Sequence, residues 1–221
     1  MFDFFRWRDT TVPYRPGSAH TQPFGIRTIE IGNPLHLGND RGARPPEILS
    51  PFDGELEWSL LPGTVAGSLL TIIPKNAINY VELQVMHAEA RSSQITYHGR
   101  SVSRGEELPV IAGDVGLSTG PHTHTELVVR SSVDLLDRLR EQSTPIYVDE
   151  IVNNAFLWNH CAEYGFDVVE WKQRITRQAV SWGITEMTDK YAVRTALPDY
   201  RIPHWGRGAT IHINPQWALD I

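Results

Sequence analysis

Short runs of alternating apolar and polar residues fill the chain between about residues 27 and 130. Each run is bounded by Gly, Pro, Asn or Asp, and this pattern predicts β-strands joined by turns. The predicted strands are Arg27–Ile31, Glu55–Leu60, Leu69–Pro74, Tyr80–His87, Leu108–Ala112 and Thr123–Arg130. The Asp53-Gly54 pair predicts a tight turn before the second of them. The sequence therefore predicts a mainly antiparallel β region here.

The spacing of apolar residues changes after Ser131 to the spacing typical of helices. The predicted helices are Val133–Glu141 with Ser132 as N-cap, Asp149 to about Tyr164 closed by Gly165, and Val168–Trp182 between Asp167 and Gly183. A final strand is predicted at Ala209–Ile213. We therefore expect an α+β protein, with a mainly β core of antiparallel sheet and a C-terminal α-helical appendage.

These changes in apolar spacing and composition divide the chain into three predicted parts. Residues 1–26 are rich in Pro, Gly, Thr and aromatic residues and form an N-terminal loop-rich arm. Residues 27–131 form the central β domain, and residues 132–221 form a mainly helical C-terminal module.

Composition narrows the classes of function. The formal net charge of −6 and the lack of a Lys/Arg stripe argue against a nucleic-acid partner. Since no stretch has the ~18–20 apolar residues of a membrane span, we expect no membrane partner. The single Cys161 excludes a disulfide framework within the chain and predicts a buried structural thiol. The first residues lack the apolar run of a signal peptide, so we expect synthesis in the cytoplasm without an export signal.

Three short segments of the β region carry candidate chemistry. His36 and Asp40 flank Gly38 in a predicted loop, which lets the backbone fold tightly and bring both side chains together. His122 and His124 are two apart on a predicted strand and therefore share one face. His87 ends another predicted strand. Taken alone, a loop His-Asp pair is typical of solvent-facing residues, and a strand-end His is typical of structural ones.

Taken together, the segments resemble the lysostaphin-type zinc endopeptidases from about residue 24 to 130. The matching motifs are His36-x-Gly38-x-Asp40, Ser50-Pro51-x-Asp53-Gly54, Met86-His87, Gly113-Asp114-Val115-Gly116 and Gly120-Pro121-His122-x-His124-x-Glu126. The sequence departs from the family at Thr123 and Thr125, where bulky apolar residues are usual. Because these two point away from the histidines in a strand, we expect them to affect packing behind the site.

The resemblance implies a lysostaphin-like zinc peptidase domain in residues 27–131. Its metal ligands would be His36, Asp40 and His124, which leave a fourth position of Zn²⁺ for water. His122 and His87 would be catalytic: His122 as general acid–base, His87 as hydrogen-bond donor to the oxyanion, with exchanged roles as the alternative.

Glu126 has two interpretations that stay open: it is a partner of a metal ligand, or it is a solvent-exposed strand residue. The histidines without a family counterpart are interpreted as structural or surface residues. They are His20, His98, His160, His204 and His212.

The resemblance also implies a substrate, the peptide stems or cross-links of bacterial peptidoglycan. We favour a phage-encoded lysin or virion tail-associated hydrolase acting at the cell wall, over a bacterial protein exported by an atypical route. The C-terminal module and the N-terminal arm would then dock onto phage tail or baseplate proteins. The alternatives are a structural tail component that keeps the peptidase fold as a scaffold, and a non-hydrolytic metal or sugar binder.

Overall fold

The computed structural model describes residues 20–30, 32–42, 44, 46–75, 80–91, 96–131, 133–142, 146–194 and 209–215. All strand pairings among these residues are antiparallel. The mainly antiparallel β fold with a short helical region, expected from the sequence, is confirmed. No helix in the described ranges is long and apolar enough to cross a membrane.

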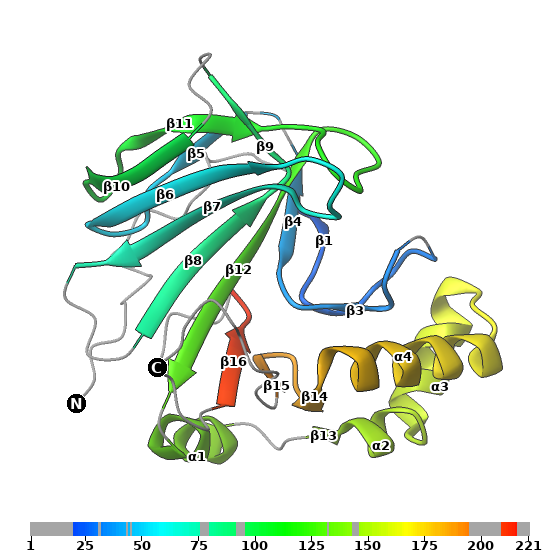
Figure 1. Ribbon diagram of the computed structural model, residues 1–221. Helices are drawn as coiled ribbons and strands as arrows, with labels where there is room; N and C mark the ends of the chain where they lie inside the picture. The colour runs from blue at the N-terminus through cyan, green and yellow to red at the C-terminus, as the bar shows by residue number, and fades with distance from the viewer. Residues whose placement is uncertain are drawn as a thin grey trace.

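One large sheet organises the molecule (Figure 1). Its strands, in spatial order, are β10 (Thr96–Val102), β6 (Gly54–Leu61), β7 (Gly67–Pro74), β8 (Tyr80–Met86), β12 (His122–Ser131), β16 (Ala209–Ile213), β15 (Tyr191–Arg194), β14 (Ile184–Met187) and β13 (Ile146–Tyr147). Strand β12 is central. One of its edges pairs with β8, while the other pairs first with β4 (Asn39–Gly42) and then with β16.

Strand β1 (His20–Gln22) pairs with β4 and so also belongs to the large sheet. Two smaller sheets complete the β structure of the described residues. Strands β5 (Glu47–Leu49), β11 (Glu107–Ala112) and β9 (Ala88–Ala90) form a three-stranded sheet, and β2 (Gly25–Ile26) pairs with β3 (Leu35–His36). The helices are α1 (Val133–Gln142), α2 (Val148–Ile151), α3 (Ala155–Tyr164) and α4 (Val168–Trp182), and Figure 1 shows α4 next to β3.

The apolar residues of these strands form two cores. The first core lies on one face of the large sheet, where Leu83 of β8 and Leu127 and Val129 of β12 are buried. Alternation along the strands directs His124 and Glu126 of β12 to the opposite face. The second core joins α3 and α4 to β3, through Leu35, Leu37, Trp171 and Ile175 among others. The chain thus leaves one face of its main sheet for polar residues.

The helices differ from the predicted ones at one place. The single helix expected from Asp149 to Tyr164 is wrong, because the chain breaks into α2 and α3 at Asn153 and Asn154. The Asn154 side chain caps α3 by accepting a hydrogen bond from the backbone N–H of Phe156. The closing of α3 by Gly165 and the bounds of α4 between Asp167 and Gly183 are confirmed, and in the structure Asp167 is the N-cap and Gly183 the C-cap of α4. The expected Ser132 cap lies outside the described residues.

The strand predicted at Arg27–Ile31 is also wrong, since residues 27–30 lie in no strand and Ile31 is outside the described ranges. Short strands such as β14 and β15 were not predicted, because four residues carry too little alternation to be recognised. The predicted domain boundaries stay a prediction. In the structure, the main sheet continues from β12 into β16 of the C-terminal part.

Candidate metal centre

Two of the three predicted ligands are held side by side by the main sheet. Asp40 of β4 lies directly opposite His124 of β12 in the strand register. Both side chains are buried on the face opposite the first core. The Asp40 Oδ1 atom is 2.9 Å from Nδ1 of His124. Strand pairing therefore fixes both residues before any metal is considered.

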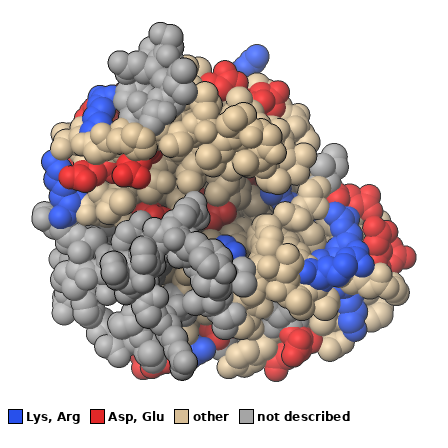
Figure 2. Space-filling model, in the orientation of Figure 1, with Lys and Arg blue, Asp and Glu red and all other residues tan. Residues whose placement is uncertain are grey.

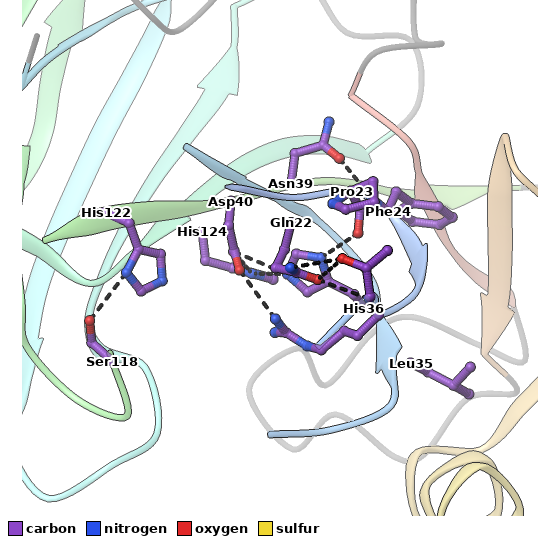
Figure 3. Close-up of polar contacts among 12 residues, drawn as sticks. Gln22, Pro23, Phe24, Leu35, His36, Asn39, Asp40, Ser118, His122 and His124 are labelled. Atoms are coloured by element: carbon purple, nitrogen blue, oxygen red, sulfur yellow. Dashed lines mark hydrogen bonds and ion pairs between the residues drawn. The ribbon is translucent and has the colours of Figure 1, made fainter. Parts of the chain in front are cut away.

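The third predicted ligand reaches the same point from β3. The Nε2 atom of His36 is 2.8 Å from His124 Nδ1 and 3.1 Å from Asp40 Oδ1. The three ligand atoms thus form a nearly equilateral triangle (Figure 3). A tetrahedral Zn²⁺ with bonds of about 2.0–2.1 Å keeps its ligand atoms about 3.3 Å apart. The side chains fit such an ion with shifts of a few tenths of an ångström.

Hydrogen bonds outside the triangle set which ring nitrogen faces it. Nδ1–H of His36 donates to the carbonyl of Pro23 at 2.7 Å, which leaves Nε2 with its lone pair toward the centre. Nε2–H of His124 donates to Oε1 of Glu126 at 2.8 Å, which leaves Nδ1 facing the centre. Partners of this kind orient metal-binding histidines in proteins and raise their basicity.

Glu126 continues this chain of contacts into the C-terminal part. The residue is only 9% exposed, so the interpretation as a solvent-exposed strand residue is wrong, and its contact is with the predicted ligand His124. Its second oxygen, Oε2, accepts a hydrogen bond of 2.9 Å from Nδ1 of His212 on β16. His212 was interpreted as structural or surface; it is buried and is linked to the predicted ligand His124 through Glu126. Its one sequence signal was a polar residue inside the apolar run of β16.

Arg27 supports the carboxylate from the other side. Its Nη1 lies 3.3 Å from Oδ2 of Asp40, the oxygen that does not face the two histidines. This ion pair leaves Oδ1 as the oxygen directed to the centre. The sequence did not single out Arg27, because it lies 13 residues before Asp40 in a segment predicted to be a strand.

Gly38 lies where the loop of His36 meets β12. A Cβ atom here would lie 2.8 Å from Nε2 of His124 and still closer to the carbonyl oxygen of Thr125. Only a residue without a side chain therefore fits here, so Gly38 allows the backbone to approach β12 closely. The two threonines, Thr123 and Thr125, are buried on the far side of the strand, as expected.

The charges of the cluster follow from burial and hydrogen bonding. Burial lowers the pKa of His36 to about 4, so its ring is neutral near pH 7. Burial also disfavours the charged form of His124, but hydrogen bonds to Asp40 and Glu126 outweigh it and raise the pKa to about 9. For Asp40 the hydrogen bonds from His124 and His36 outweigh burial and hold its pKa far below the usual range. In the metal-free cluster near pH 7, His36 is therefore neutral, whereas His124 is protonated on both ring nitrogens.

The two predicted catalytic histidines lie together beside the triangle. The ring centroids of His87 and His122 are 4.7 Å apart, and those of His87 and His124 are 6.3 Å apart. His87 follows β8 with a φ of 63°, a left-handed conformation that is uncommon for a residue other than glycine. Such strained positions cluster at functional sites.

Each of these two rings is anchored through Nδ1 to the backbone. Nδ1–H of His87 donates to the carbonyl of Val115, and Nδ1–H of His122 donates to that of Gly120, both at 2.8 Å. Figure 3 shows the further contact of His122 with Ser118. Burial lowers the pKa of His87. Its neutral ring therefore has an Nε2 that accepts hydrogen bonds.

All five predicted site residues line one cavity of about 1050 Å³. Its walls come from the segment before β4, from the β6–β7 turn and the loop before β12, and from Trp182, Arg194 and His212. Figure 2 shows this face of the molecule hollowed near its centre.

Comparison with known proteins gave matches among solved structures. No protein-family model and no curated protein matches the chain. The chain is similar to the catalytic domain of the antimicrobial peptidase lysostaphin from Staphylococcus simulans, with 18% identity, a TM-score of 0.44, and coverage of 57% of this chain and 92% of that one. It is also similar to the catalytic domain of a point mutant of EnpA, a prophage-encoded M23 protein from Enterococcus faecalis (26% identity, TM-score 0.40, 52% and 82% covered).

A zinc-containing peptidase from Vibrio cholerae is a further match, with 24% identity and a TM-score of 0.43, over 57% of this chain and 36% of that one. The chain therefore spans about a third of the length of that protein. Over somewhat more than half of its length, the chain is structurally similar, at low sequence identity, to lysostaphin-type peptidase domains.

Proposed function

We propose that this protein is a zinc-dependent endopeptidase that cleaves peptide stems or cross-links of bacterial peptidoglycan. One observation carries the proposal: His36, Asp40 and His124 direct three ligand atoms to one point, while hydrogen bonds hold the outer ring nitrogens of both histidines away from it. Two further histidines, His87 and His122, line the same cavity. Three ligands and an open fourth position are the arrangement of a catalytic zinc.

Zinc bound here would lower the pKa of a coordinated water to roughly 7 and polarise the scissile carbonyl. His122 would take a proton at Nε2 and return it to the leaving amine, and this role is supported by the Gly120 carbonyl, which holds its Nδ1–H. His87, once protonated at Nε2, would donate a hydrogen bond to the oxyanion. Since the resting ring of His87 is neutral, an exchange of these two roles is the alternative.

The choice of peptidoglycan rests on the sequence motifs, and the cavity is in keeping with it. The opening is bounded by loops on both sides of β8 and β12, which suits an extended peptide. We also propose the bacterial cell wall as the place of action, with a phage lysin or tail-associated hydrolase as the setting. The appended C-terminal residues support that setting. Detection of the protein in purified virions or phage lysates tests it, and absence from both would contradict it.

Zymography on purified peptidoglycan tests the enzymatic activity. The wild-type protein should clear the substrate, lose this activity with a chelator and regain it with zinc. His122→Ala should keep its zinc and lose turnover, whereas His98→Ala, at an exposed position on β10, should behave as the wild type. Full activity of His122→Ala would contradict the catalytic assignment. A folded, zinc-loaded protein without activity would favour the alternative, a structural tail component that keeps the fold as a scaffold.

A further inference from the structure

The three predicted ligands are not supported in the same way. Asp40 and His124 lie on β4 and β12, which pair over four residues each. His36 lies on β3, whose strand pairing in the described part of the chain is the two-residue pairing with β2. A two-residue ladder holds a loop weakly. The position of His36 must therefore depend on contacts from elsewhere.

Gln178 of α4 makes the most direct of these contacts. Its Oε1 accepts a hydrogen bond from the backbone N–H of Leu35, and its Nε2 donates to the carbonyl of Leu35, each at 2.7 Å. The amide thus pairs with the backbone next to His36 as a neighbouring strand would. Gln178 is buried, and water cannot readily replace it as a partner.

Two more side chains of the helical part bind the segment before His36. Nη2 of Arg174 on α4 donates to the carbonyls of Glu30 and Gly32, at 3.0 and 2.6 Å. Nε2–H of His160 on α3 donates to the carbonyl of Arg27 at 2.8 Å. All these bonds go to backbone atoms, so they fix the path of the segment and not the identity of its side chains.

Apolar packing against α4 also holds the same segment. Leu35 and Leu37, the two neighbours of His36, are buried in the second core. There they join Trp171, Ile175 and Ala179 of α4. Since alternate residues of an extended segment face opposite sides, burial of both leucines directs His36 to the cavity.

We propose that α3 and α4 hold His36 in place for metal binding, with Gln178 as the principal positioning residue. The helical part is then a component of the metal centre and not only a separate appendage. This inference rests on the proposed function in one respect, that the cluster of His36, Asp40 and His124 binds zinc. It concerns the affinity of that site and needs no knowledge of the substrate.

Zinc affinity of two matched variants tests the proposal. Gln178→Met keeps the length of the side chain but removes both hydrogen bonds, and Gln173→Met makes the same change at an exposed position of α4. Competition of the full-length protein with a chromophoric chelator measures the dissociation constant for zinc. We expect Gln178→Met to bind zinc about tenfold more weakly, in the range seen for partners of metal ligands. The Gln173→Met variant should match the wild type.

A second pair of variants keeps the test decisive if Gln178→Met does not fold. Arg174→Ala removes two hydrogen bonds at the surface, while Arg177→Ala removes an exposed arginine of the same helix. Only Arg174→Ala should weaken zinc binding and speed hydrogen exchange at the Leu35 amide. Equal affinities in all folded variants would overturn the positioning role alone. A wild type that binds no zinc would overturn this role and the proposed function together.

Discussion

The candidate metal centre joins two regions that are built differently. One region is the sheet, in which the register of β4 and β12 places Asp40 and His124 opposite each other. The other is the segment of His36, which α3 and α4 hold through backbone hydrogen bonds and apolar packing. The sheet fixes its residues by repeated backbone pairing, whereas the helices hold the segment of His36 through a few side-chain contacts. We therefore expect the sheet side to be robust and the His36 side to be sensitive to changes far from the metal.

The largest effect should come from removing a ligand on the sheet side. His124→Ala takes away one ligand and the anchor of Glu126, so we expect loss of zinc binding and of peptidase activity together. Metal analysis of the purified variant and zymography measure the two losses. Retention of one zinc per chain in His124→Ala would contradict the ligand assignment.

A smaller loss of zinc affinity should follow from substitutions of residues that support a predicted ligand without being ligands themselves. Glu126→Ala removes the acceptor that orients His124, and we expect about 10–100-fold weaker zinc binding. His212→Ala, which acts only through Glu126, should have the same direction and a smaller size. Chelator competition on both variants measures the order. A larger loss for His212→Ala than for Glu126→Ala would contradict the chain of contacts.

Affinity for zinc should also depend on pH through the sheet-side histidine. Zinc must displace the proton that His124 holds up to about pH 9 in the metal-free protein, whereas His36 is already neutral above about pH 4. The affinity should therefore rise with pH, by up to about tenfold per unit, and level off near pH 9. Titrations between pH 6 and pH 9 test this. An affinity that is constant over this range would show that His124 carries no displaceable proton.

The smallest effect on zinc affinity is expected from a substitution in the helical region that removes no contact with the segment of His36. Asp167→Ala removes the N-cap of α4, which accepts a hydrogen bond from the backbone N–H of Glu170. Such a loss costs about 1 kcal/mol of stability. Thermal unfolding should show this decrease, with zinc affinity near that of the wild type. A severe loss of zinc binding would mean that the whole helix, and not single contacts, controls the site.

The sequence predicted the two regions unequally. Strands β6, β7, β8 and β12 and helices α1 and α4 were predicted within two residues, because each has enough apolar periodicity to be recognised. The five site residues came from local motifs, and the structure brings them to one cavity. The break before α3 was missed, because apolar spacing on both sides hid the capping role of Asn154.

The supporting contacts could not be predicted, for a physical reason. Gln178 lies 143 residues from Leu35, and His212 lies 86 residues from Glu126. No local pattern marks such pairs, because they depend on how the sheet continues from β12 to β16 and on where α4 packs. The one sequence signal of Gln178 was a polar residue on the apolar face of an amphipathic helix.

The proposed function requires that His36, Asp40 and His124 bind one zinc ion. Anomalous diffraction at the zinc edge, from crystals of the zinc-loaded protein, tests it most directly. We predict a single strong peak about 2.0–2.1 Å from His36 Nε2, Asp40 Oδ1 and His124 Nδ1. A peak elsewhere, or no peak among these three atoms, would contradict the account.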